Sequence, residues 1–476
     1  MTARTGSLSL AAELARFAVD IDPRQTSSGE AVLERARLHL LDTVGLTLAG
    51  WLTEDAVGDK LVTGLADAGS SVLIGTGRHV SAPTAALING ALATAWSFDD
   101  VDLSTVMHCE SFAVSAALAV AADRPAPGRR LLDAIVVGIE VALRLASAVP
   151  GSTGLYDAGF HGSSVFGSIG AAAAAGRMLE LDPEQMTNAL ALAVSFASGT
   201  AAGWTDGSGR NKTIQPGWAA HSGVIAARLA AAGYSCSHRT LDDDRGLMWA
   251  HTRGLGWDRS AVLAGAGVNW RLESLRIKRH PTGSSTQATV DCALRIVQDY
   301  GVQAADVVSA RILLPTDYAG ILHDIGSSLH RPPTGAASIG SFPLILARVL
   351  LDGSFTLSHR TDAAVRERTL LDLADRVTVA AELEAEAHDP DVLPTVIEVL
   401  TASGAIVRVA SDSVPHEDDR DAVIRKFSGN VAAAGIAAEQ EATVRDAILA
   451  VDEAHDVRSL LDALRALIAD VQPARP

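Results

Sequence analysis

The sequence has few aromatic residues and few cysteines. Phenylalanine, tryptophan and tyrosine make up 4% of the 476 residues, so the interior must be built mainly from smaller side chains. Alanine, leucine, valine and glycine supply the apolar mass, which suits closely packed helices. The cysteines, Cys109, Cys236 and Cys292, are widely separated and form no C-x-x-C pair. This pattern excludes a disulfide framework and is typical of a reducing compartment, so we expect a cytoplasmic protein.

The sequence also lacks a long uncharged apolar run and a surplus of positive charge. The N-terminus carries Arg4, Glu13 and Arg16 where a secretory signal needs an apolar core, and no later segment has the length of a bilayer span. The net charge is −17 and the isoelectric point is about 5.2, which argues against nucleic acids and anionic membranes as partners. Local lysines and arginines can still hold an anionic small molecule in one cleft.

The length and the hydrophobic pattern predict two domains, mainly helical with an α+β part. A chain of 476 residues, 48% hydrophobic and 20% charged, exceeds the size at which one core keeps growing. Residues 1–270 are predicted to form helix after helix with no strand, and Pro83–Ala95 and Ser111–Ala122 are apolar nearly all round, as in buried helices. Residues 271–413 mix helices with β-branched alternation, and residues 414–476 return to a helical pattern that should pack on the first domain. The predicted strands are Val307–Leu314, Val377–Leu383, Thr395–Leu400 and Ala405–Ala410, with a hairpin turn at Thr401–Gly404.

The segment Thr205–Tyr234 joins a Gly-rich polar turn to an apolar helix, with Lys212 at the junction. The turn Asp206–Gly209 contains residues that accept positive φ angles. Backbone N–H groups at a helix start, together with Lys212 and Arg210, would make a local anion site. A solvated loop that carries a lysine is the alternative, and only other segments of the chain can decide between the two.

Two further segments concentrate polar groups between apolar helices. The first carries Ser97, Asp100 and His108, where a carboxylate could orient a histidine base or could simply cap a helix. The second places His161 between glycines ahead of a small-residue helix, where a ligand can approach the backbone. A histidine that only satisfies structural hydrogen bonds is the alternative there.

Two more candidates lie in the second half of the chain. Lys278, Arg279 and His280 stand at the switch between the predicted domains and could line a cleft for a polyanion or belong to a solvated linker. Tyr318 follows a predicted strand, where tyrosine also occurs as an ordinary packing residue.

Together these residues suit the removal of a proton next to a carboxylate. Cations would hold the acid groups and stabilise the developing enolate, while a histidine or lysine moves protons. The sequence has no zinc-ligand spacing, no Walker loop and no G-x-S-x-G turn, so the residues define this reaction class without a metal or cofactor motif.

Several short motifs then give nearly the whole chain a family resemblance. They are Asn89–Ala93 before Phe98–Asp100, His161–Gly162 before a Gly/Ala helix, Lys212 with Gly217, Ala220 and Gly223, Lys278-x-x-Pro281 before a helix with Asp291, and Leu350–Gly353. In these motifs and their order the chain resembles the MmgE/PrpD family, which includes 2-methylcitrate dehydratase, cis-aconitate decarboxylase and an iminodisuccinate epimerase. The resemblance implies a helical domain built from both termini, a smaller α+β lid, a homodimer, and a metal-free, cofactor-independent active site in the cleft between the domains.

Carried over by position, the resemblance assigns roles to the candidate residues. Lys212 and Lys278 would bind carboxylates and stabilise the enolate, His108 and His161 would transfer protons, and Asp100 would orient His108. Tyr318 is a further catalytic candidate. The candidate substrate-binding residues are Arg210, Arg279, His280 and Ser97.

Two positions depart from the family pattern. Ser97 stands where the family commonly has an aspartate, and Gly283 stands where the decarboxylase-like pattern has a histidine. These departures weigh against dehydration or decarboxylation of a tricarboxylate, whereas an epimerase needs fewer groups. We expect a hydro-lyase that removes a proton α to a carboxylate of a small di- or tricarboxylic acid, such as a 2-methylcitrate-like acid. An epimerase of a related acid such as iminodisuccinate is the second possibility, and a catalytically silent binding protein is the third.

Overall fold

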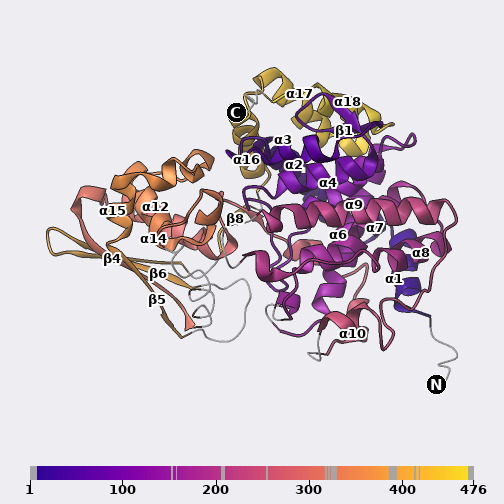
Figure 1. Cartoon of the computed structure of the whole chain (residues 1–476), viewed down its shortest axis with the longest axis horizontal. Coiled ribbons are helices and arrows are strands. Elements are labelled where there is room, and N and C mark those ends of the chain that lie inside the picture. Colours follow the sequence, from indigo (N-terminus) through magenta and orange to yellow (C-terminus); the bar gives the residue numbers. More distant parts are fainter. Residues whose placement is uncertain are drawn as a thin grey trace.

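The computed structural model divides into a larger helical lobe and a smaller lobe that carries a sheet (Figure 1). It describes residues 8–151, 154–156, 158–204, 210–252, 256–316, 319, 322, 330–384, 394–411, 414–417 and 419–469. The molecule is mainly helical with small sheets, as predicted. Among these residues no helix combines the length and the apolar character needed to cross a membrane.

The larger lobe is a stack of helices around one extensive apolar core. α7 packs against α6 and α9, and α9 also packs against α4 and α8. The N-terminal part of this lobe contains α1 (Leu10–Asp20), α2 (Gly29–Gly50), α3 (Val57–Leu65), α4 (Ala82–Ala93), α5 (Glu110–Val120), α6 (Gly128–Ser147), α7 (Gly162–Met178), α8 (Pro183–Ala193), α9 (Asn211–Ala231), α10 (Leu247–Thr252) and α11 (Arg259–Val262).

Small residues let these helices approach one another closely. α4 and α5 are buried nearly all round, as their apolar sequence predicted. A Cβ atom on Gly217 of α9 would lie 2.3 Å from the carbonyl oxygen of Leu87 in α4, and one on Gly223 would lie 2.5 Å from Ala171 in α7. Both distances are too short for any side chain, so these glycines permit α9 to lie directly against its neighbours.

A small hairpin in this lobe was not expected. β1 (Ser71–Leu73) and β2 (Arg78–Val80) pair antiparallel beside α4, so the prediction of no strand in this half was wrong. Three-residue strands are too short to show a two-residue alternation, which explains why the pattern did not reveal them.

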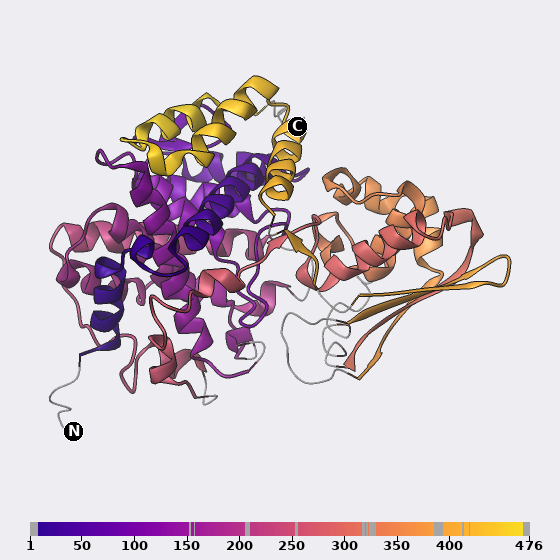
Figure 2. The same ribbon diagram turned by 180° about the vertical axis from the view of Figure 1, so that it is seen from behind.

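The C-terminal segment returns to the helical lobe, as its pattern predicted. α16 (Arg420–Ala433), α17 (Ala438–Leu449) and α18 (Arg458–Ala466) contribute residues to the same core, and α16 packs along α2. Seen from behind, the yellow helices lie at the end of the lobe away from the N-terminus, where α16 and α17 contact α2 (Figure 2).

The smaller lobe has its own apolar core, built from residues between Val290 and Val409. Its sheet has the order β5-β4-β6-β7, with β4 and β5 parallel and the other pairs antiparallel. The strands lie where β-branched alternation predicted them, and α12 packs on β6 and β7 while α14 packs on β5. The elements are α12 (Gln287–Gln298), β4 (Val307–Pro315), α14 (Phe342–Asp352), α15 (Arg368–Ala374), β5 (Val377–Leu383), β6 (Thr395–Thr401) and β7 (Ile406–Ser411).

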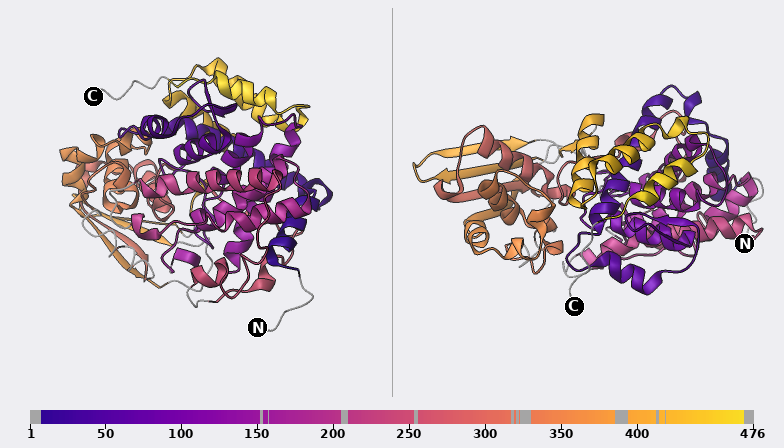
Figure 3. Two further views of the ribbon diagram at one scale, coloured as in Figure 1. Left: turned by 45° about the vertical axis from the view of Figure 1, so that its right-hand side comes forward. Right: turned by 90° about the horizontal axis from the view of Figure 1, so that it is seen from above.

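The two passages of the chain between the lobes lie side by side. β3 (Ile277–Lys278) pairs antiparallel with β8 (His416–Glu417), and the neck between the lobes is narrow when seen from above (Figure 3). The main chain of Arg276 also pairs with that of Val101 in the helical lobe. Lys278 is thus held in the neck. The predicted domain boundaries at residues 270 and 413 fall near these passages and stay predictions.

Candidate active site

His108 lies in the connection between α4 and α5 and is held by main-chain contacts. Its backbone N–H donates to the Ser163 hydroxyl at 2.8 Å, and its Nδ1 lies 2.5 Å from the carbonyl oxygen of Asp100. A carbonyl oxygen can only accept, so Nδ1 carries the proton and Nε2 carries the lone pair. Asp99 Oδ2 lies 3.4 Å from the same Nδ1. The arrangement presents His108 as a base at Nε2.

His161 is the residue directly before α7, and its ring lies beside that of His108. Its backbone N–H donates to the Gly199 carbonyl at 3.0 Å, and its Nδ1 lies 2.7 Å from Oε1 of Gln215 in α9. The Gln215 amide nitrogen donates to the carbonyl of Thr200 at 2.9 Å, which turns the amide oxygen toward His161. His161 therefore also carries its proton on Nδ1. The two imidazole rings lie 6.3 Å apart, measured between their centroids.

Two lysines complete this group. Lys278 is 1% exposed, and its Nζ donates to the carbonyl oxygen of Ser97 at 3.0 Å and lies 3.4 Å from Asp99 Oδ1. Lys212 lies in the first turn of α9 and is half-buried. After burial, its charge is the next cause that lowers the pKa of both histidines.

Burial sets the protonation of the group. It lowers the pKa of His161 to about 3 and, with the charges of Lys212 and Lys278, lowers the pKa of His108 well below its usual range. Burial and the neighbouring Lys278 lower the pKa of Lys212 to about 8. At neutral pH the site therefore holds two neutral histidines and a Lys212 that is protonated but close to its titration range.

Asp100 acts on His108 through its main chain. Its carboxylate accepts the backbone N–H groups of Cys109 and Glu110, at 3.0 and 2.9 Å, and so caps α5. Burial and the nearby Asp99 raise the pKa of the Asp100 carboxyl well above its usual range. The side chain of Asp100 thus caps α5, while its carbonyl oxygen accepts a hydrogen bond from His108.

The other predicted residues have different surroundings. Arg279 pairs with Asp291 at 2.8 Å and with Glu417 at 3.0 Å, and His280 Nε2 lies 2.5 Å from the other oxygen of Asp291. Ser97 is buried and has a left-handed backbone, with φ of +52°. The binding roles of these side chains stay predictions. Tyr318 and the turn Asp206–Gly209 lie outside the described residues.

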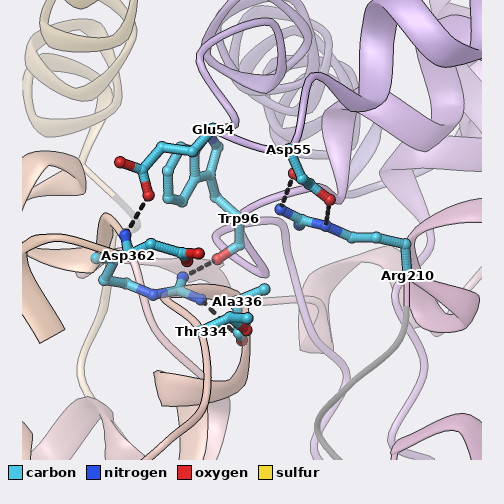
Figure 4. Close-up of a pocket in the computed structure, with 8 residues that line it drawn as sticks. Glu54, Asp55, Trp96, Arg210, Thr334, Ala336 and Asp362 are labelled. Atoms are coloured by element: carbon cyan, nitrogen blue, oxygen red, sulfur yellow. Dashed lines mark hydrogen bonds and ion pairs between the residues drawn. The ribbon is translucent and has the colours of Figure 1, made fainter. Parts of the chain in front are cut away.

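Arg210 lines a small cavity between the lobes. It pairs with Asp55 at 2.7 Å and donates to the carbonyl oxygen of Ala95 at 2.7 Å. Figure 4 shows this cavity, of about 70 Å³, with Glu54 and Trp96 of the larger lobe facing Asp362 and Ala336 of the smaller one.

Sequence patterns did not single out several residues that support the site. Asp99 joins His108 and Lys278, although its neighbour Asp100 was the chosen carboxylate. Gln215 orients His161. No periodicity or motif marks Gln215, whereas Asp99 could have been found from the paired Asp-Asp motif.

The scarcity of lysine in the sequence is a further signal that points to the site. The chain contains only four lysines, Lys60, Lys212, Lys278 and Lys426. Lys426 reaches the same region from α16, where its Nζ lies 2.7 Å from Asp42 and donates to the carbonyl of Phe98 at 2.8 Å. Three of the four lysines thus gather around one connection of the helical lobe.

Among the residues that the structure describes, two buried groups have donor atoms close enough to share a metal ion. They are His39, Asp100 and Glu110, and Asp99, Asp100 and His108. The ammonium group of Lys278 lies beside Asp99, and the charge of Lys426 acts on Glu110, so each group already has a cation near it. These cations disfavour a divalent ion, and the predicted independence of metal stays a prediction.

The fold and the site together define a two-lobed protein with a buried cluster of histidine, lysine and aspartate side chains beside the neck between its lobes. Family models described as the MmgE/PrpD N-terminal and C-terminal domains match residues 12–260 and 280–453. The chain belongs to the MmgE/PrpD family, which confirms the predicted resemblance.

Three relatives show how far the similarity extends. The chain is 26% identical to the cis-aconitate decarboxylase-like protein oryM of Aspergillus oryzae, over 97% of this chain and 98% of that protein. It is 28% identical to a cis-aconitate decarboxylase of Aspergillus terreus, over 76% of each chain. It is 29% identical to the human cis-aconitate decarboxylase, over 77% of this chain and 74% of that protein.

Proposed function

We propose that this protein is a lyase that removes a proton α to a carboxylate of a small polycarboxylic acid. The observation that carries this proposal is the pair of imidazole rings, 6.3 Å apart and neutral at neutral pH, beside Lys212 and Lys278. A neutral histidine can accept a proton, and two cations can hold carboxylates and stabilise the charge of an enolate. The family and its relatives named cis-aconitate decarboxylase support an acid of this kind as substrate.

The leading outcome is elimination of water. The base takes the α-proton, the electrons of that C–H bond form the C=C bond, and the C–O bond to the neighbouring hydroxyl breaks. The leaving hydroxyl needs a proton to depart as water. Lys212, with a pKa of about 8, is protonated at neutral pH and only moderately acidic, which suits it to donate that proton.

An epimerase is the second candidate, and Ser97 is the observation that favours it. The family commonly has a carboxylate at this position, while here a buried serine holds Lys278 through its carbonyl oxygen. Epimerisation needs only removal and return of one proton, so it tolerates one acid group fewer. A catalytically silent binding protein is the third candidate.

Proton NMR in D₂O distinguishes these functions. The purified protein is incubated with citrate-like acids, cis-aconitate and iminodisuccinate, and both α-deuterium uptake and alkene signals are followed. New vinyl signals from a saturated acid, or a decarboxylated alkene from cis-aconitate, support a lyase. Deuterium uptake without a new alkene supports the epimerase. Turnover should vanish in Lys212→Ala and persist in Lys60→Ala, a change at an exposed lysine of α3. A wild-type protein that turns over none of these acids contradicts the proposal.

Substrate access requires movement. His108 is 3% and His161 1% exposed, so an acid from solution cannot reach either ring while the lobes keep this arrangement. We propose that the lobes separate at the neck to admit it.

The assembly and the conditions of the reaction complete the proposal. We propose a cytoplasmic homodimer that needs neither metal nor cofactor. Size-exclusion chromatography with light scattering measures the mass of the protein in solution. Turnover after treatment with EDTA measures whether the reaction depends on a metal ion.

A further inference from the structure

Four consecutive carbonyl oxygens between α4 and α5 each accept a hydrogen bond from a cationic side chain. These carbonyls form what we name the 95–98 segment. The pairs are Ala95 with Arg210 at 2.7 Å, Trp96 with Arg360, Ser97 with Lys278 at 3.0 Å and Phe98 with Lys426 at 2.8 Å. The four cations come from four distant parts of the chain, so the segment is held from several directions at once.

Arg360 is the donor that comes from the body of the smaller lobe. It is 2% exposed, and its Nη1 donates to the Trp96 carbonyl and, at 2.9 Å, to the Pro281 carbonyl. Its guanidinium carbon lies 5.7 Å from the centroid of the Trp96 ring, within the range of a cation–π contact. Its Nη2 lies 3.5 Å from the carbonyls of Gly335 and Ala336.

Arg360 thus contacts the main chain both next to the acceptor of Lys278 and shortly after Lys278 itself. Trp96 directly precedes Ser97, whose carbonyl accepts from the Lys278 ammonium, and Pro281 follows Lys278 by three residues. One guanidinium therefore ties the neighbour of the lysine's acceptor to the segment that directly follows the strand of the lysine. Ser97 also has a φ of +52°, a backbone conformation that costs free energy in a non-glycine residue and persists only where its surroundings hold it.

We propose that Arg360 is a positioning residue that fixes Lys278 against Asp99 and His108 when the smaller lobe is seated on the larger one. An arginine suits this task because its planar fork can donate to several carbonyls at once, which a lysine cannot do. Only the expected effect of Arg360 on turnover rests on the proposed function. The structural consequence of Arg360, the placement of Lys278, can be measured without any substrate.

The charge of Arg360 provides a second readout. Burial is the main cause that lowers the pKa of Lys212, and the charges of Lys278 and Arg360 lower it further, while Asp99 raises it. Removal of the Arg360 charge should therefore raise the pKa of Lys212. A purely structural arginine elsewhere in the smaller lobe would leave that pKa unchanged.

The experiment uses the full chain labelled with ¹³C at the lysine Cε atoms. The four lysines give four signals in the wild type, which Lys→Arg variants assign. Arg360→Lys adds a fifth signal, which is identified by its absence from the wild type. The signals are titrated between pH 6 and pH 11 in wild type, Arg360→Met, Arg360→Lys and Arg348→Met. Arg348 is the matched control because it is 4% exposed and pairs with Asp352 and Glu367 within the smaller lobe.

The variants should separate charge from geometry. Arg360→Met should raise the pKa of Lys212 by roughly half a unit and shift the Lys278 signal. Arg360→Lys keeps the charge and loses the fork, so it should leave the pKa of Lys212 near its wild-type value and still shift the Lys278 signal. Arg348→Met should change neither. If Arg360→Met does not fold, Arg360→Lys alone carries the geometric test.

Activity supplies the last comparison. On an acid that the wild type turns over, both Arg360 variants should lower kcat by about 10- to 100-fold and change KM less. A misplaced Lys278 stabilises the transition state less well, while binding of the ground-state substrate is less affected. An unchanged Lys278 signal in the folded Arg360 variants would overturn the positioning role, whatever happens to the pKa of Lys212. If the lysine signals move as expected but the wild type turns over no acid, the proposed function fails and the positioning role stands.

Discussion

The ammonium group of Lys278 lies 3.4 Å from the carboxylate of Asp99, and each side chain is 1% exposed. Burial of a charged pair is costly, and removal of one partner leaves the other charge without compensation. The pair also sits against His108, since the second oxygen of Asp99 lies 3.4 Å from the imidazole. One buried contact thus joins the neck between the lobes to the histidine of the candidate site.

Replacement of Lys278 should affect stability and activity separately. Lys278→Met should lower the free energy of unfolding by about 3 kcal/mol, because Asp99 loses its partner, and kcat/KM by about 10³-fold. The double variant Lys278→Met with Asp99→Asn should recover most of the stability and none of the activity. Guanidinium denaturation and steady-state kinetics measure the two quantities. Lys60→Met is the control, and a double variant as unstable as the single one would contradict the pairing.

The pH dependence of substrate binding should follow Lys212. Its pKa is lowered to about 8, so the cation is present below that pH and lost as the pH rises through it. If Lys212 holds a carboxylate, KM should rise about tenfold for each pH unit above 8. In Lys212→Arg the charge persists at every pH measured, so KM should stay level to about pH 9.5. An equal rise of KM in both proteins would assign the effect to another group.

Acid stability should depend on His161. An unfolded histidine titrates near 6.5 and the folded His161 near 3, so the unfolded state binds more protons between these values. The contribution that neutral His161 makes to the free energy of unfolding at neutral pH is therefore lost as the pH falls below 6.5. At pH 5 the loss should be about 2 kcal/mol. His161→Gln cannot titrate, so its loss of stability between pH 7 and pH 5 should be smaller than that of the wild type by this amount. Urea denaturation at the two pH values gives the comparison, and parallel losses would refute it.

The backbone at Ser97 should discriminate between side chains. Glycine accepts a φ of +52° without steric cost, whereas a β-branched residue does so rarely. Ser97→Gly should leave the free energy of unfolding within about 1 kcal/mol of the wild type, while Ser97→Val should lower it by about 1–3 kcal/mol. Thermal denaturation monitored by circular dichroism measures both. Equal stabilities of the two variants would mean that the left-handed conformation is not maintained in solution.

Local sequence pattern was enough for most of the fold. α4 and α5 are buried because their apolar residues cover every side, and β6 and β7 form a hairpin because β-branched strands flank a turn that ends in Gly404, with φ of +84°. The pattern missed β1 and β2 because three residues cannot display a period of two. Each of these outcomes depends on residues close together in sequence.

The candidate site was predicted only in part. The motifs that carried the family resemblance led to His108, His161, Lys212 and Lys278, and the structure brings these four together. They did not show that the carbonyl oxygen of Asp100 contacts His108. Every residue has a main-chain carbonyl, so the residue type at position 100 cannot predict this contact.

The sequence by itself determined the helical and strand segments, the buried faces and the residue types able to move protons, since these follow from periodicity and side-chain chemistry. Tertiary structure alone decided which distant groups meet. Arg360 and Trp96 are 264 positions apart, and Lys278 and Ser97 are 181 apart. No local pattern encodes such contacts, because they arise when two separately packed cores are set against each other at the neck.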